Sequence, residues 1–231
     1  MDPFPRVEYE DRAVWFPDAE TLVLADLHLG RVRQSRVDFP VGDGKDLPNR
    51  LDRLCERYEP TAVVVAGDLV HAFDTVPYGV ADAIQNLVDV VVDAGAELIV
   101  TSGNHDPTLE RVESLDPVDE YHLDSSTVVH HGHEQPTANT DRYVIGHEHP
   151  ALTIEGNRRP CYLECWAQHG EASVLVLPAF SRVAVGTTVN DLTAADSMSP
   201  LLTDTDACRP IVSTTDESLS FPPLGKLRPH L

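Results

Sequence analysis

The segment Thr21-Leu-Val-Leu-Ala25-Asp26-Leu-His28-Leu-Gly30 joins a short apolar run to a polar cluster. The same arrangement recurs at Ala62-Val-Val-Val-Ala66-Gly67-Asp68-Leu-Val-His71, and again where Glu97-Leu-Ile-Val-Thr101 precedes Gly103-Asn104-His105-Asp106. Apolar runs of this length between turn residues predict buried strands. The three segments therefore predict three buried strands that each end in chemically active side chains.

Amphipathic stretches separate these strands. Residues 46–58 predict a helix with Leu47, Leu51, Leu54 and Tyr58 on its buried face and with Arg50, Asp52, Arg53 and Glu56 pointing outward. Residues 80–94 predict a second helix, closed by Gly95. Alternation of strands and helices implies parallel pairing with right-handed crossovers, and hence an α/β fold.

The second half of the chain changes character. Short strand candidates at 126–130, 142–145, 160–163 and 173–177 follow one another with little helical periodicity, which predicts a second sheet packed on the first. From residue 186 onward the chain is rich in Ser, Thr, Asp and Pro, but 199–202 and 210–212 supply apolar anchors. We expect one domain over 1–231, with 186–231 as a partly ordered closing segment.

The composition is acidic, with 38 acidic against 17 basic residues and a formal net charge of −21. This balance disfavours a polybasic protein that coats DNA or a membrane surface, and a hydrophobic content of 42% is too high for a disordered acidic chain. Self-repulsion of this size is tolerable in very salty cytoplasm, so the composition indicates a halophilic, archaeal source. The N-terminal residues show no signal peptide, so a cytoplasmic location without membrane contact is expected.

Four cysteines, at positions 55, 161, 165 and 208, form no Cys-x-x-Cys pair and no regular framework. Buried free thiols in a reducing compartment are therefore expected, in preference to disulfides or a zinc site.

Two further histidine clusters follow in the second half: His130-His131-Gly132-His133 and Gly146-His147-Glu148-His149. Each of the five clusters taken alone is weak, since a turn or a surface histidine pair would explain it. Their joint occurrence after apolar runs is informative, because ligands of open α/β sheets gather beyond the carboxyl ends of the strands.

In this order the clusters D-x-H, G-D-x-x-H, G-N-H-D, H-G-H and G-H-x-H resemble the calcineurin-like metallophosphoesterases over residues 21–150. Leu177-Pro-Ala-Phe180 and Leu224-Gly-Lys-Leu227 further resemble the small phosphoesterases that include the bacterial DNA-ligase-associated enzymes. The resemblance implies the metallo-dependent phosphatase fold, a four-layer αββα sandwich of two mixed sheets.

The resemblance also implies a centre of two divalent metal ions. Asp26, His28 and His149 would bind the first ion and Asp68 would bridge both, while the second would also take Asn104, His131 and His147. His131 is preferred over His130 because it directly precedes Gly132. These oxygen and imidazole ligands suit Mn²⁺, our first choice, as well as Fe or Zn²⁺.

In this family a metal-bridging hydroxide attacks the phosphoester, and His105 is the residue expected to protonate the leaving alkoxide. The protein phosphatases of the family carry an aspartate three residues after the bridging one, where this chain has His71, as the nuclease and phosphodiesterase branch does. His71 could contact a diester's phosphate or leaving group, or it could merely cap the strand end. Arg31 could bind a phosphate oxygen, or be a solvated loop residue.

The expected function is therefore a dinuclear metal-dependent phosphoesterase acting on phosphodiesters such as cyclic nucleotides or DNA ends. A phosphomonoesterase and a non-catalytic metal-binding scaffold are the alternatives. The expected partners are a phosphoester substrate, a nucleotide or DNA among them, and DNA-repair proteins. The oligomeric state is left open.

Overall fold

The structure is a computed structural model that describes residues 3–4, 6–30, 43–71, 79–107, 109, 115–214 and 217–231. Side chains of residues 43–45 are not included in the description.

The first sheet has five strands in chain order and is mixed. Its central strands pair in parallel and confirm the three predicted buried strands and their direction. The preceding strands, which the sequence analysis missed, add an antiparallel edge. In order the strands are β1 (Glu8–Glu10), β2 (Ala13–Phe16), β3 (Thr21–Leu24), β4 (Ala62–Val65) and β5 (Glu97–Val100).

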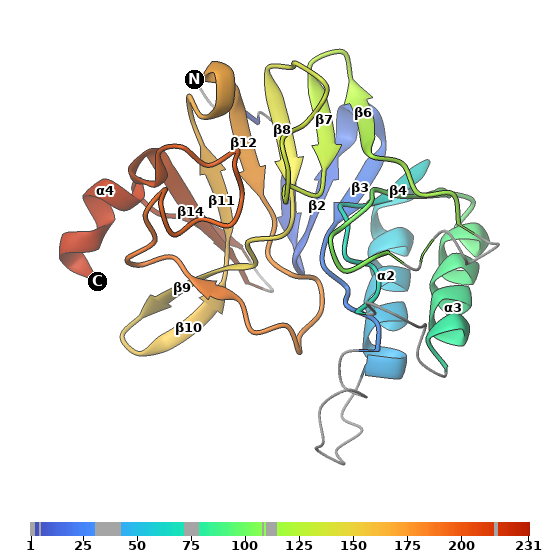
Figure 1. Ribbon diagram of the computed structural model, residues 1–231. Helices are drawn as coiled ribbons and strands as arrows, with labels where there is room; N and C mark the ends of the chain where they lie inside the picture. Colours follow the sequence, from blue (N-terminus) through green and yellow to red (C-terminus); the bar gives the residue numbers. More distant parts are fainter. Residues whose placement is uncertain are drawn as a thin grey trace.

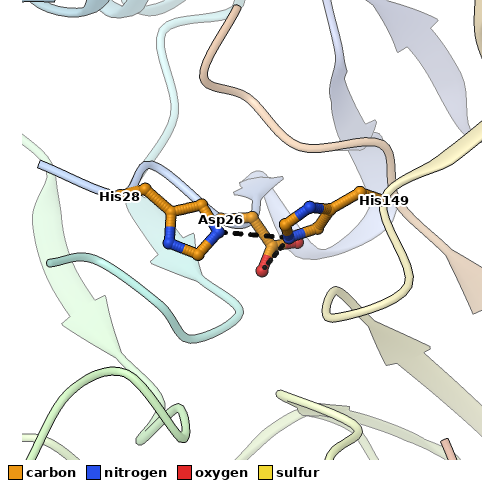
Figure 2. Close-up of side chains that lie close together, drawn as sticks. All are labelled: Asp26, His28 and His149. Atoms are coloured by element: carbon orange, nitrogen blue, oxygen red, sulfur yellow. Dashed lines mark hydrogen bonds and ion pairs between the residues drawn. The ribbon is translucent and has the colours of Figure 1, made fainter. Parts of the chain in front are cut away.

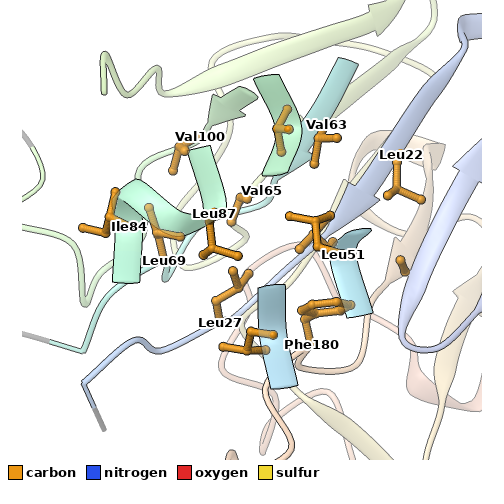
Figure 3. Close-up of a cluster of buried hydrophobic side chains, with 14 of the residues drawn as sticks. Leu22, Leu27, Leu51, Val63, Val65, Leu69, Ile84, Leu87, Val100 and Phe180 are labelled. Carbon is orange, nitrogen blue, oxygen red and sulfur yellow. The ribbon is translucent and has the colours of Figure 1, made fainter. Parts of the chain in front are cut away.

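Two long helices, α2 (Asp43–Tyr58) and α3 (Val80–Asp93), cover one face of this sheet. Their apolar stripes meet alternate residues of the strands, so that Leu51 and Leu87 pack near Leu22, Val63 and Val65 (Figure 3). Both predicted helices are confirmed. Gly95 follows α3 with a φ of +78°, a left-handed conformation that suits glycine just beyond a helix end.

The prediction that Arg50 points outward is wrong. Its side chain is only 1% exposed, and its guanidinium lies 4.0 Å above the ring of Phe180. The guanidinium donates to Asp11 Oδ2 at 2.8 Å and to the Phe180 carbonyl at 2.7 Å. Position 50 lies three residues after Leu47 and four before Leu54, on the buried side of the helix, and these acceptors make burial of the charge tolerable.

The second sheet has seven strands, which confirms the prediction of a second sheet. Three of them, β7, β8 and β12, pair in parallel and the others are antiparallel. The predicted strand at 160–163 is wrong in its bounds, because one strand ends at Pro160 and another begins at Tyr162. The order is β15 (Ser218–Ser220), β14 (Cys208–Ser213), β11 (Tyr162–Cys165), β12 (Ser173–Val176), β8 (Arg142–Ile145), β7 (Thr127–His130) and β6 (Glu120–Asp124).

The two sheets pack face to face, as the predicted sandwich requires (Figure 1). Val23, Ala25 and Val64 from the first sheet meet Val144 and Leu175 from the second. Alternate residues of each strand thus point into the core between the two sheets, while the others point to the outer face of their sheet.

The outer face of the second sheet is covered by the C-terminal segment. Leu201, Leu202, Leu224 and Leu227 pack there, and the short helix α4 (Leu224–Leu227) is the only α-helix of the described residues on this side. A small sheet of β10 (Asn157–Pro160), β9 (Pro150–Ile154) and β13 (Thr187–Thr188) adjoins it. The remaining elements are short 3-10 helices: η1 (Pro17–Ala19), η3 (His169–Glu171), η4 (Thr205–Ala207) and η5 (Arg228–His230).

The expectation of four free thiols is wrong for two of them. Cys165 on β11 and Cys208 on β14 form a disulfide, while Cys55 and Cys161 are free and buried. Cys165 and Cys208 are directly opposed in an antiparallel pair, with their Cα atoms 4.0 Å apart. Their sequence separation of 43 concealed this pairing, since the register of the two strands cannot be read from spacing.

None of the helices in the described ranges combines the length and apolar character needed to cross a lipid bilayer.

Candidate metal centre

The loops after β3, β4, β5, β7 and β8 meet at one edge of the two sheets. Hydrogen bonds from backbone N–H groups hold them together: His28 N–H donates to the Asp68 carbonyl at 2.9 Å, and His105 N–H donates to the side-chain oxygen Asp68 Oδ1 at 2.9 Å. From the second sheet, His147 N–H donates to Asp26 Oδ2 at 3.0 Å. The carboxylates of the first sheet therefore position the loops of both sheets.

One group of side chains that could hold a metal ion consists of Asp26, His28 and His149, whose ligand atoms lie within 4.8 Å of one another. His149 Nε2 lies 3.1 Å from Asp26 Oδ1 and 3.2 Å from His28 Nε2. Figure 2 shows the two rings pointing toward each other beside the carboxylate.

A second group consists of Asp26, Asp68 and His131, all buried. His131 Nε2 lies 3.4 Å from Asp68 Oδ1 and 3.1 Å from Asn104 Oδ1. The other nitrogen of this ring, Nδ1, lies 3.0 Å from the Ala66 carbonyl. Because a carbonyl only accepts, Nδ1 carries the proton and the Nε2 lone pair faces the two oxygens.

Two carboxylates connect the groups. Asp26 belongs to both of them. Asp68, for which the sequence suggested the bridging place, directs Oδ1 toward His131 and has Oδ2 3.8 Å from His28 Nε2. Each carboxylate therefore reaches residues of both groups.

The electrostatics keep these ligands in the form that binds a cation. Burial disfavours ionisation of Asp26, yet its interactions with neighbouring imidazoles, above all with His149, hold its pKa below the usual value. Burial lowers the pKa of His131 to about 3 and that of His147 to about 4. These imidazoles are neutral at pH 7, as metal ligands must be.

The backbone is unusual at these positions. Asp26, His28, Asp68, His147 and His149 all have positive φ, between 46° and 67°. Residues other than glycine rarely adopt this left-handed conformation, and where it is maintained at several neighbouring positions the surrounding structure must compensate for the strain. Of the thirteen described non-glycine residues with positive φ, these five are candidate ligands.

The donor set fits divalent metal ions. Three acceptor atoms, His131 Nε2, Asp68 Oδ1 and Asn104 Oδ1, face one another, and two imidazole nitrogens face a buried carboxylate in the other group. Hydrogen bonds alone cannot satisfy the three facing acceptor atoms around His131, whereas a cation can. Oxygen and imidazole donors without thiolate suit Mn²⁺, Fe or Zn²⁺.

Two further histidines lie at the open side of the centre. The rings of His71 and His105 are stacked, with centroids 4.8 Å apart and an interplanar angle of 26°. Each centroid lies 5.4 Å from that of His28. Both side chains are partly exposed, unlike the buried His28 and His131.

The structure separates the two adjacent histidines 130 and 131. His130 Nδ1 accepts a hydrogen bond from Gly132 N–H, and its ring stacks on His133 at 6.2 Å between centroids. His147 packs edge-on against His131, with centroids 5.0 Å apart. Arg31, the suggested phosphate ligand, lies outside the described residues.

Sequence reasoning missed the buried carboxylate of Asp106. It accepts backbone hydrogen bonds from Val70 at 2.9 Å, Gly103 at 3.1 Å and Leu69 at 3.3 Å, and so joins the loops after β4 and β5. Burial raises its pKa to about 6, against these hydrogen bonds. Its position in the Gly-Asn-His-Asp cluster could have pointed to it, but an aspartate at this position is also typical of a turn.

Glu148, between two candidate ligands, is also buried, and no role was expected for it. Its Oε1 accepts from Ser197 Oγ at 2.5 Å and from Ser199 N–H at 2.7 Å. It thereby attaches the loop of His147 and His149 to the C-terminal segment. No sequence pattern connects residues so far apart.

A family model and two solved structures match this chain. A family model described as calcineurin-like phosphoesterase matches residues 20–204. The chain is similar in structure to a Pseudomonas putida nuclease, MPE, with a TM-score of 0.62, 21% identity and coverage of 91% of this chain and 92% of that one. A phosphoesterase from E. coli, YfcE, gives a TM-score of 0.45 at 16% identity, over 71% of this chain and 83% of that one.

A search among curated proteins found no match. Members of the matched family use a dinuclear site for divalent metals and hydrolyse phosphoester bonds, and the two ligand groups of this chain agree with that chemistry. Since the family model spans most of the sequence, the chain belongs to the calcineurin-like phosphoesterase family.

Proposed function

We propose that this phosphoesterase acts on phosphodiesters, and that it uses two divalent metal ions, of which manganese is the first choice. The observation that supports a diester is the stacked pair of imidazoles, His71 and His105, at the open side of the centre. Hydrolysis of a diester releases one alkoxide, while the other ester oxygen stays bonded to the phosphorus. Two neighbouring proton donors can therefore interact with two different oxygens.

The residues proposed to hold the ions are those of the two groups and their neighbours. Asp26, His28 and His149 would bind one ion, and Asn104, His131 and His147 would bind the other, with Asp68 between them. When bound, the pair of ions supplies positive charge against the anionic phosphate and acidifies the attacking water.

The protein's own groups perform the remaining work. The hydrogen bond from His105 N–H to Asp68 Oδ1 fixes the loop that carries the His105 ring, whose Nε2 lies 4.0 Å from Asp68 Oδ2. We assign to His105 the transfer of a proton to the leaving alkoxide, for which an imidazole is suited near neutral pH. His71 would donate to the phosphate oxygen that keeps its ester.

A substrate comparison tests the proposal. With Mn²⁺, kcat/KM for bis(4-nitrophenyl) phosphate should exceed that for 4-nitrophenyl phosphate by about tenfold or more, the size of one lost charged contact. The panel should extend to cyclic nucleotides and to single- and double-stranded DNA. A strong preference for the monoester would indicate a phosphatase, and no turnover of any ester would indicate a scaffold.

The role of His105 has its own test. His105→Ala should lower kcat far more for a diester with an alkyl leaving group than for a nitrophenyl ester, because nitrophenolate leaves without a proton. His122→Ala, which removes an exposed imidazole from β6, is the matched control and should change neither rate. Equal losses on both substrates would contradict an acid role.

A further inference from the structure

A cavity of about 510 Å³ lies outside the metal centre and is lined by none of the candidate ligands. Its walls come from the β1–β2 turn, the β9–β10 hairpin, the segment 178–182 and the strands β14 and β15. Its volume is typical of a small-molecule site. Three arginines line it, Arg12, Arg159 and Arg182, in a chain whose net charge is −21.

Two of the arginines that line this cavity form no ion pair among the described residues. Eight of the eleven arginines in the described ranges have a carboxylate oxygen within 4.0 Å. The three described arginines without one are Arg12, Arg158 and Arg159, and two of these line the cavity. Unpaired guanidinium groups are unexpected in so acidic a chain, and an anion in the cavity would pair with them.

Arg12 is held in place without being neutralised. Its Nη1 donates to the carbonyls of Ser181 at 2.8 Å and Ala179 at 3.1 Å. Burial, together with the nearby Arg50 and Arg182, lowers its pKa to about 10. The guanidinium therefore carries a charge that its surroundings disfavour and that a bound anion would stabilise.

The carboxylates of the cavity do not cancel this charge. Asp11 is already shared by Arg50, at 2.8 Å, and Arg182, at 3.5 Å. Glu155 is exposed at the hairpin turn. The lining thus holds three guanidinium groups against two carboxylates, with Phe221 and Pro178 as an apolar wall.

The cavity adjoins the centre through a single segment. Ser181 accepts from Arg12 through its carbonyl and donates its N–H to the Asp26 carbonyl at 3.3 Å, while Phe180 N–H donates to the Ala25 carbonyl at 2.7 Å. Arg12 and Asp26 therefore bind opposite sides of the same residue. A chain substrate cut at the centre would extend along this edge of the sheets.

We propose that the cavity binds a flanking phosphodiester of a single-stranded nucleic acid, at a nucleotide next to the one that is cut, through Arg12 and Arg159. The guanidinium fork matches two phosphate oxygens, and the apolar wall leaves room for a sugar or base. This inference rests on the proposed phosphodiesterase function and names its substrate class.

Arg159 is the residue to vary, because it lines the cavity and its side chain is exposed. Arg158 is the matched control. It has the same type, exposure and strand, but it is absent from the cavity lining, since neighbouring strand residues face opposite sides.

Binding is measured by fluorescence anisotropy, with the metal-loaded protein and a labelled phosphorothioate oligothymidylate that resists hydrolysis. Arg159→Ala should weaken binding about tenfold, the loss of one exposed charged contact. The slope of log K against log salt should fall by about 0.7, one phosphate contact on a single strand. Arg158→Ala should change neither value.

Two further arms identify the source of the phosphate. In kinetics, Arg159→Ala should raise KM about tenfold for an oligonucleotide and leave bis(4-nitrophenyl) phosphate unaffected, because that substrate is too short to reach the cavity. Competition with inorganic phosphate shows whether a free anion is preferred. Arg159-dependent binding of inorganic phosphate without any binding of the oligonucleotide would overturn the proposal.

The proposed function and this inference fail separately. An enzyme that cleaves no phosphodiester would contradict the function, whereas the binding measurement, repeated after EDTA treatment, does not depend on turnover. Equal effects of the two arginine substitutions, or no effect of Arg159→Ala, would overturn the flanking-phosphate site while leaving the function intact.

Discussion

The two sheets contribute to the centre in different ways. In the first, three parallel strands in chain order each deliver a polar cluster to the same edge, and the helices between them cover a single face. In the second, β7 and β8 deliver the histidine clusters, and neighbouring strands come from distant parts of the chain. The centre lies where the two edges meet, so its geometry depends on sheet packing as well as on the motifs.

The coverings of the two sheets differ as well. Long helices bury the outer face of the first sheet, whereas the second sheet is covered by the C-terminal segment. A disulfide also joins two of its strands, β11 and β14. We therefore expect substitutions at the shared edge to affect chemistry and substitutions in the coverings to affect stability. The following experiments test that division, in order of decreasing effect.

The largest effect is expected at Asp68, whose oxygens face His28 from the first sheet and His131 from the second. Asp68→Asn should lower kcat/KM for bis(4-nitrophenyl) phosphate by about a thousandfold, several kcal/mol of lost electrostatic stabilisation. The bound metal, measured by elemental analysis, should fall with it. The exposed Asp89→Asn on α3 is the control, and an equal loss there would show that the effect is not local.

Arg50 tests the covering of the first sheet. Arg50→Met removes the partner of Asp11 and of the Phe180 carbonyl, and should lower the free energy of unfolding by about 3 kcal/mol. Arg53→Met, on the exposed side of α2, should change it by less than about 0.5 kcal/mol. Urea unfolding measures both, and similar values for the two variants would refute the buried role of Arg50.

The disulfide tests the covering of the second sheet. Replacing Cys165 and Cys208 together by serine should lower the free energy of unfolding by about 2 kcal/mol, the lower end for such loops, and leave kcat unchanged. Dithiothreitol should lower the melting temperature of the parent protein and have no effect on the double variant. A reductant-insensitive parent would mean that the two thiols are not joined.

The smallest effect is expected at Gly146, where the edges of the two sheets meet. A Cβ on Gly146 would lie 2.7 Å from both Ala25 Cβ and Asp26 Oδ2, so Gly146→Ala should destabilise the protein by about 1–2 kcal/mol and reduce metal affinity. Gly156→Ala, in a hairpin turn with no atom within 4 Å of the added methyl, should leave metal affinity unaltered. Isothermal titration with Mn²⁺ distinguishes the two, and unchanged affinity in Gly146→Ala would show that the edges do not meet closely there.

The same difference explains what could be predicted from the sequence. The parallel strands and their helices follow from patterns within about 15 residues, and the three clusters after β3, β4 and β5 follow from strand ends. The pairing of β11 with β14, and hence the disulfide, depends on a register between residues 43 apart. Local periodicity contains no such information.

Individual side chains show a second limit. Arg50 was expected at the surface because arginine is rarely buried, and only the positions of Asp11 and Phe180 reveal why it can be. Asp106 and Glu148 act through backbone groups of distant loops, which no motif specifies. The candidate ligands could be predicted from the sequence because metal binding restricts their residue types. The residues that position these ligands depend on how the chain packs, which the sequence alone does not reveal.

The central claim is that loops from both sheets form one centre for two divalent ions. Anomalous diffraction from crystals grown with Mn²⁺ tests it most directly. We expect two peaks, one beside Asp26, His28 and His149, and one beside Asp68 and His131. A single peak, or none at this edge of the sheets, would contradict it.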